Sequence, residues 1–186
     1  MAKIEEIGKY VEDFFRERDK EYCGTVWFYK HHIEIVYNIG LELAEKYGAD
    51  KEVVGLAALL HDVGKAIDPE KHDEAGALEA KRILKEYGYP EKTIEKVSHC
   101  IESHMCEAKQ PETLEAKILS TADVLCKFKT PFFFILFASG KRLSPEEVID
   151  KIKIKIEKDY KRVFFGDEKE EVRKQYEALK TMVKGV

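Results

Sequence analysis

Residues 53–65 read VVGLAALLHDVGK, an apolar run that ends in a histidine and an aspartate side by side. Asp50 can cap a helix made of this run, and Gly64 can end it. Because such a helix is apolar on nearly all sides, we predict that it is the buried central helix of its domain. His61 and Asp62 then lie at its C-terminal end, where a buried carboxylate needs an ion pair or a metal as its partner. If the His-Asp pair is considered without the rest of the chain, a histidine at a helix end followed by an exposed aspartate is the alternative interpretation.

The rest of the chain predicts an all-α fold, because apolar residues recur at helical spacing and no segment alternates with period two. A capping box at residues 144–147, SPEE, opens a late helix that Gly166 is expected to close. We expect a single globular domain with three parts: an N-terminal helix within residues 1–24, a core over 25–130 and a C-terminal helical extension over 131–186. The expected helices span about residues 3–19, 25–47, 50–62, 71–87, 91–106, 111–128, 144–165 and 167–183.

Composition and charge narrow the class of protein. Of the 186 residues, 44% are hydrophobic and 37% are charged, which is ordinary for one globular domain. The net charge of −4 argues against a nucleic-acid-binding surface, so we expect no stable nucleic-acid partner. The first residues carry acids and lack the apolar core of a signal peptide, and the apolar block at 131–138 is too short to span a bilayer. We therefore expect a cytoplasmic protein without a membrane partner.

The cysteines and the aromatic block are interpreted as structural. The four cysteines show no Cys-x-x-Cys spacing, which predicts small buried thiols rather than a zinc site; they are Cys23, Cys100, Cys106 and Cys126. The aromatic block at 132–137 is expected to belong to the core or to a subunit contact, which allows for a homodimer.

Helical periodicity indicates which histidines face inward. His32 falls in steps of three and four on an apolar stripe with Val36 and Leu43, whereas His31 lies on a different line. His104 continues an apolar stripe of its own helix. His99 precedes His104 by five residues, about 140° around the helix, so the two rings cannot point the same way.

Asp123 lies in ILSTADVLC, residues 118–126, where an acid with few charged neighbours needs a partner. The simplest assembly brings four side chains from three helices around one divalent cation: His32, His61, Asp62 and Asp123. Neutral imidazoles and carboxylates with open positions suit Mn, Fe, Co, Ni or Zn, with Mg also allowed. Lys65 beside such a metal could neutralise a phosphate; alternatively it is a solvated turn residue.

This pattern resembles the HD superfamily of metal-dependent phosphohydrolases, in particular its small single-domain branch. Residues 61–65 resemble the family's His-Asp signature turn, 32–36 its first histidine motif and 120–123 its last motif. The resemblance covers about residues 25–128, and it implies a helical domain whose metal ligands are His32, His61, Asp62 and Asp123.

Some branches of that family hold a second metal, bridged by Asp62, with two further histidines. His72 and His104 stand at suitable places for these ligands, so one or two ions are expected. His99 is grouped with this second metal or phosphate site as a neighbouring or wall residue. His72 could alternatively be an exposed residue at a helix start.

The resemblance implies hydrolysis of a phosphoester, and a nucleotide or a related small phosphorylated metabolite is the expected substrate. A metal would activate a water, Asp62 would orient or deprotonate that water, and Lys65 would stabilise charge on the phosphoryl oxygens. Two other interpretations stay open: a di-iron oxygenase on the same scaffold, and a non-catalytic domain that binds a metal or a nucleotide for regulation.

Overall fold

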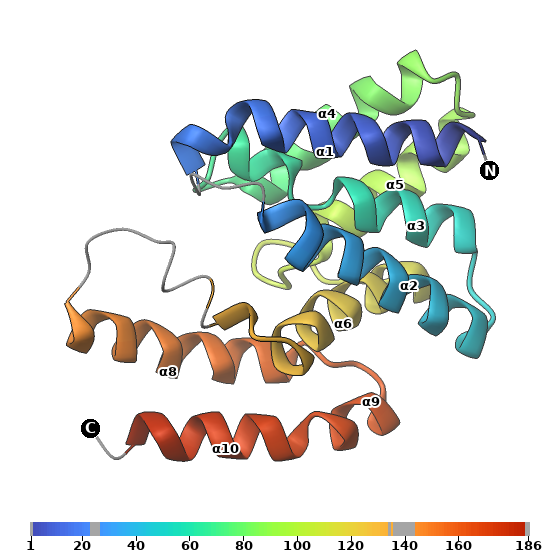
Figure 1. The fold of residues 1–186 in the computed structure, drawn as a ribbon. Helices are drawn as coiled ribbons and strands as arrows, with labels where there is room; N and C mark the ends of the chain where they lie inside the picture. The colour runs from blue at the N-terminus through green and yellow to red at the C-terminus, as the bar shows by residue number, and fades with distance from the viewer. Residues whose placement is uncertain (1, 23–26, 134, 136–143, 185–186) are drawn as a thin grey trace.

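The structure, a computed structural model, describes residues 2–22, 27–133, 135 and 144–184, and these residues form helices and no strands (Figure 1). The predicted all-α fold is confirmed. In chain order the elements are α1 (Ala2–Tyr22), a π-helical turn (Tyr29–Ile33), α2 (Glu34–Tyr47), α3 (Lys51–Leu60), a 3-10 helix (Val63–Ala66), α4 (His72–Glu86), α5 (Glu91–Ser103), α6 (Leu114–Lys129), α8 (Pro145–Lys161), α9 (Gly166–Glu171) and α10 (Arg173–Lys184).

Helix α3 is the central helix, as its apolar sequence predicted. Every residue from 53 to 60 is buried, and α1, α2, α5 and α6 all pack against it (Figure 1). The side chain of Asp50 caps the helix by accepting hydrogen bonds from the backbone N–H groups of Glu52 and Val53. A buried helix of this kind presents its last residues, His61 and Asp62, to the interior instead of to solvent, and both are fully buried.

Gly64 does not end α3, so that prediction was wrong. The helix stops at Leu60, and Gly64 lies within the 3-10 helix that follows. A Cβ atom at Gly64 would collide with the backbone carbonyl oxygen of His72 and crowd the backbone nitrogen of Gly76. The position is therefore glycine because the start of α4 packs directly on this turn, and that contact brings His72 next to the end of α3.

Two other helix ends differ from the prediction. Helix α6 begins at Leu114, three residues after Pro111, because the hydroxyl of Thr113 caps it by accepting the N–H of Ala116. Helix α8 has the predicted capping box but ends at Lys161, and Gly166 opens α9 instead of closing α8. The last predicted helix is divided into α9 and α10.

The C-terminal helices return to the core of the molecule. Helix α10 lies beside α8, and both lie on the α6 side of the bundle (Figure 1). Glu168 of α9 accepts hydrogen bonds from Lys46 and Tyr47 at the end of α2. Cys100 and Cys126 are buried, Cys106 is half-buried, and Cys23 lies outside the described residues. Among the helices described, none is both long and apolar enough to cross a membrane.

Candidate metal centre

The structure brings His32, His61, Asp62 and Asp123 together in the core, and all four are buried. The Nε2 atom of His32 lies 3.2 Å from Nε2 of His61, 3.1 Å from Oδ2 of Asp62 and 3.3 Å from Oδ1 of Asp123. His32, His61 and Asp123 form a group whose donor atoms all lie within 4.8 Å of one another, a spacing that could hold a metal ion.

His32 stands on the π-helical turn that precedes α2, where the sequence had predicted a continuous α-helix. A π-helical turn contains one more residue than an α-helical turn, and such turns are frequent at functional sites. His31 is exposed and His32 is buried, as the stripe predicted. The ring of His32 packs on the ring of Phe132, with 4.9 Å between their centroids. Phe132 and Phe133 are core residues, whereas residues 134, 136 and 137 of the aromatic block lie outside the described part of the chain.

A second group consists of Asp62, His72 and His104, again with donor atoms within 4.8 Å of one another. The Oδ1 atom of Asp62 lies 3.9 Å from Nε2 of His72 and 3.8 Å from Nε2 of His104. Its Oδ2 atom faces His32 and His61 instead, at 3.1 and 3.3 Å. Asp62 therefore stands between the two groups with one oxygen toward each, an arrangement consistent with a binuclear metal site.

Backbone carbonyl groups orient two of the rings. The Nδ1 atom of His61 lies 2.8 Å from the carbonyl oxygen of Ala58, and the Nδ1 atom of His104 lies 2.6 Å from that of Ile101. Because a carbonyl oxygen only accepts, each Nδ1 must carry the proton. The Nε2 lone pairs of both rings then point at the centre, which is the orientation that metal ligation requires.

Protonation states in the centre also suit a metal. Burial lowers the pKa of His32 to about 4, and it lowers the pKa values of His72 and His104 below their usual range. Burial acts in the opposite direction on Asp62, but the electrostatic interaction with His61, the charge of Lys65 and the hydrogen bonds of His32 and His61 hold the pKa of Asp62 well below its usual value. The imidazoles of His32, His72 and His104 are thus neutral and the carboxylate of Asp62 is ionised at neutral pH, as metal ligands must be.

Two buried atoms of the second group show that a cation fits there. Oδ1 of Asp62 and Nε2 of His72 have no hydrogen-bond partner in the described structure, although both are shielded from solvent. Such orphaned groups are costly, and a divalent cation among these nitrogen and oxygen donors would satisfy both atoms at once. The donor set of imidazoles and carboxylates suits Mn, Fe, Co, Ni or Zn.

Asp123 uses its two oxygens differently. Oδ1 faces His32, whereas Oδ2 accepts hydrogen bonds from Lys127, at 2.7 Å, and from Arg162 after α8. Burial raises the pKa of this carboxyl, but the charges of Lys127 and Arg162 outweigh it and bring the pKa well below its usual value. Lys127 could have been found from the sequence, because it follows Asp123 by one helical turn. No local pattern indicated Arg162, which comes from 39 residues away.

Lys65 borders the metal centre, whereas His99 lies outside both ligand groups. The ammonium group of Lys65 contacts Oδ2 of Asp62, and 18% of its side chain is exposed, so it borders the centre on the accessible side. His99 belongs to neither ligand group. Its Nε2 atom accepts a hydrogen bond from the backbone N–H of Glu112 at 3.3 Å.

The part of the chain that contains this centre matches a known protein family. Residues 29–127 match the family model of the HD domain, and this region contains all six residues of the two ligand groups. Curated relatives include ribonuclease Y from Alkaliphilus metalliredigens, 36% identical over 99 residues, and ribonuclease Y from Thermoanaerobacter pseudethanolicus, 39% identical over 99 residues. Each match covers 52% of this chain but only 19% and 18% of the relative, so the chain spans about a fifth of the length of these proteins.

Two solved structures share the fold. A predicted HD superfamily hydrolase from an uncultured Thermotogales bacterium is 25% identical, with a TM-score of 0.56 over 80% of this chain and 87% of that one. An HD-superfamily hydrolase from Bacillus thuringiensis is 20% identical, with a TM-score of 0.67 over 99% of this chain and 94% of that one. The second match extends the shared fold beyond residue 127, through the C-terminal helices.

Proposed function

Because this chain belongs to the HD domain family, we propose that it is a metal-dependent phosphohydrolase, a phosphomonoesterase or phosphodiesterase that acts on a nucleotide or a related small phosphorylated metabolite. The observation that carries the proposal is the position of Asp62, which stands between the two ligand groups while Lys65 contacts it from the accessible side. The carboxylate of Asp62 thus lies beside both groups of proposed metal ligands and beside the ammonium group of Lys65, which would bind the phosphate.

His32, His61, Asp62 and Asp123 would hold one ion, and Asp62, His72 and His104 would hold a second. A divalent ion supplies a Lewis acid for a phosphoryl oxygen and lowers the pKa of a water. The low pKa of Asp62 keeps this carboxylate ionised, which suits orienting the attacking water more than storing its proton. Lys65 is placed to bind an equatorial phosphoryl oxygen and to stabilise the charge that develops there.

The relatives named ribonuclease Y suggest a phosphodiester as one substrate class. The match covers about a fifth of their length, and a net charge of −4 disfavours a large nucleic-acid substrate for this chain. The related Thermotogales protein is described as a hydrolase, which supports hydrolysis over oxygenase chemistry. We therefore favour a small phosphoester.

A metal-reconstitution assay tests the proposal. The chain is stripped with EDTA, reloaded with Mn, Co, Ni or Mg, and assayed for phosphate release from p-nitrophenyl phosphate, its bis-ester, and nucleoside mono- and triphosphates. We expect hydrolysis to depend on metal and His32→Ala to lose bound metal and activity by at least about tenfold. His31→Ala is the matched control, because this neighbouring ring is exposed, and it should retain both.

Two results would contradict the proposal. Iron-dependent oxygen consumption without phosphate release would indicate the di-iron oxygenase. Bound metal without turnover of any of these phosphoesters would indicate the regulatory domain.

A further inference from the structure

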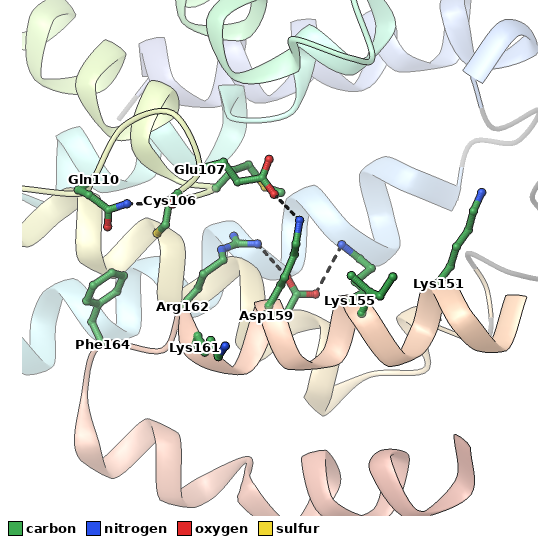
Figure 2. A pocket seen from close by; sticks show the side chains of 12 residues that line it. Cys106, Glu107, Gln110, Lys151, Lys155, Asp159, Lys161, Arg162 and Phe164 are labelled. Carbon is green, nitrogen blue, oxygen red and sulfur yellow. Dashed lines mark hydrogen bonds and ion pairs between the residues drawn. The ribbon is translucent and has the colours of Figure 1, made fainter. Parts of the chain in front are cut away.

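A cavity of about 770 Å³ lies between α8 and the segment that follows α5 (Figure 2). One wall is the face of α8 that carries Lys151, Lys155 and Asp159, and the other is formed by residues 105–107 and Gln110. Cys106 turns the chain into this second wall with a φ of 56°, in the left-handed region that few residues other than glycine adopt. The volume lies within the range of small-molecule sites.

The lining of the cavity is cationic although the chain is acidic as a whole. Four lysines and Arg162 line it, against two acids, Glu107 and Asp159. The net charge of the whole chain is −4, so positive charge is concentrated here. A concave surface of one sign attracts ligands of the opposite sign, and in this cavity those are anions.

The two acids neutralise only part of this positive charge. Glu107 pairs with Lys158 at 3.0 Å. Asp159 is shared by three cations, with Arg162 at 2.8 Å, Lys155 at 3.5 Å and Lys127 at 3.6 Å.

Two other lysines of the lining have no acidic ion-pair partner among the described residues. Lys151 and Lys161 form no ion pair with any described residue. The Nε atom of Arg162 is buried and also lacks a hydrogen-bond partner within the described chain. The lining therefore has a surplus of positive charge.

Lys155 of the lining also lies close to cations outside the lining, Lys127 and Lys65. The charge of Lys127 and burial lower the pKa of Lys155 to about 8, although Asp159 acts in the opposite direction. A lysine beside a carboxylate normally keeps its charge easily, so the lowered pKa means that the charge of Lys127 and burial together outweigh that carboxylate. An anion beside Lys155 would relieve this repulsion.

The cavity adjoins the proposed metal centre. Arg162 lines the cavity and also donates a hydrogen bond to Asp123. Met105 and Cys106 in the other wall follow directly after His104. The charges of Lys65 and Asp123 both act on Lys155. The cavity and the metal centre therefore share Arg162 as a common wall.

We propose that this cavity binds a second phosphate group of the substrate, through Lys155 and Lys151, while the phosphate to be hydrolysed lies at the metal centre. This inference rests on the proposed function and narrows it to small molecules that carry two or more phosphates, such as nucleoside diphosphates and triphosphates. Phe164 and Ile154 offer exposed apolar surface within the same lining, with 41% and 60% of each residue exposed, to the non-phosphate part of such a molecule.

Isothermal titration of the full chain with inorganic tripolyphosphate tests the cavity separately from catalysis. In metal-free protein we expect Lys155→Ala to weaken tripolyphosphate binding at least tenfold. Lys153→Ala is the matched control, because Lys153 lies on the same helix with a similar exposed fraction, 39% against 31%, but outside the lining. The control should bind tripolyphosphate as the unmodified chain does. Thermal unfolding of both variants verifies that they are folded.

The outcomes separate this inference from the proposed function. Unchanged tripolyphosphate binding in Lys155→Ala, equal weakening in both variants, or no binding to the unmodified chain each overturns the inference. Loss of binding in Lys155→Ala alone, without hydrolysis of any phosphoester, supports the cavity while the proposed function fails. In an active enzyme, Lys155→Ala should lower kcat/KM for a nucleoside triphosphate more than for the corresponding monophosphate, and equal losses for the two substrates would also count against the inference.

Discussion

Replacing Gly64 with alanine should damage the second ligand group selectively. The new Cβ atom would collide with the carbonyl oxygen of His72 and crowd the nitrogen of Gly76. Both are backbone atoms of one helix, so no side-chain rotation can relieve the collision. Either the start of α4 or the turn that carries Gly64 has to move, and both shifts change the position of His72 relative to Asp62, whereas the group of His32, His61 and Asp123 lies on other elements.

The collision at Gly64 also indicates how much stability Gly64→Ala should lose. Overpacking a well-packed core costs about 1–3 kcal/mol, and a collision between backbone atoms belongs at the upper end of that range. For a chain of this length, a loss of about 3 kcal/mol lowers Tm by about 6–12 °C. Gly166→Ala is the matched control, because nothing lies within 4 Å of its added Cβ. Its effect should stay within about 1 kcal/mol of the unmodified chain.

Thermal unfolding in EDTA measures the Tm of the metal-free protein. Metal analysis after reconstitution measures how many ions the two ligand groups bind. We expect Gly64→Ala to lose metal from the His72 group while retaining the ion of the His32 group. A Gly64→Ala protein with unchanged Tm and an unchanged metal content would refute the reasoning, because it would mean that α4 does not pack on this turn as closely as the structure shows.

Three further predictions concern the protonation, orientation and charge of the centre. Burial lowers the pKa of His32 from its usual value of 6.5 to about 4. Between these two pH values the unfolded chain takes up a proton that the folded chain does not, so the metal-free protein should lose about 3 kcal/mol of unfolding free energy as pH falls from 6.5 to 4. Urea titrations at pH 7 and 4.5 measure this loss, and equal stability at the two pH values contradicts it. Cys126 lies with Sγ 3.5 Å from Nδ1 of His32, and burial raises the pKa of its thiol to about 12, so the neutral thiol supports the ring. Cys126→Ala should weaken metal binding about tenfold in a chelator competition, whereas Cys100→Ala, also buried but with its thiol beside Thr113 instead of a ligand ring, should not. Lys65→Met should lower kcat/KM about 100-fold with little change in metal content, and a loss of metal instead would assign Lys65 a structural role at Asp62.

The sequence by itself determined the helices and their buried faces. An apolar run such as residues 53–60 can remove its surface from water only as a central helix, and the apolar stripe through Val36 and Leu43 turns His32 inward and leaves His31 exposed. The carboxylates of Asp62 and Asp123 could be recognised as candidate ligands because an acid in an apolar segment requires a partner. These conclusions need only periodicity and the cost of burying charge, which are local properties of the chain.

The tertiary structure alone decided how these pieces meet. Gly64 was interpreted as a helix end, yet its function is to admit the backbone at His72, which lies eight positions further along the chain. Arg162 reaches Asp123 from α8, and the cavity beside it forms only where that helix packs near the segment after α5. Such contacts depend on the relative placement of helices, which the packing of the whole core fixes and which no spacing within a single helix encodes.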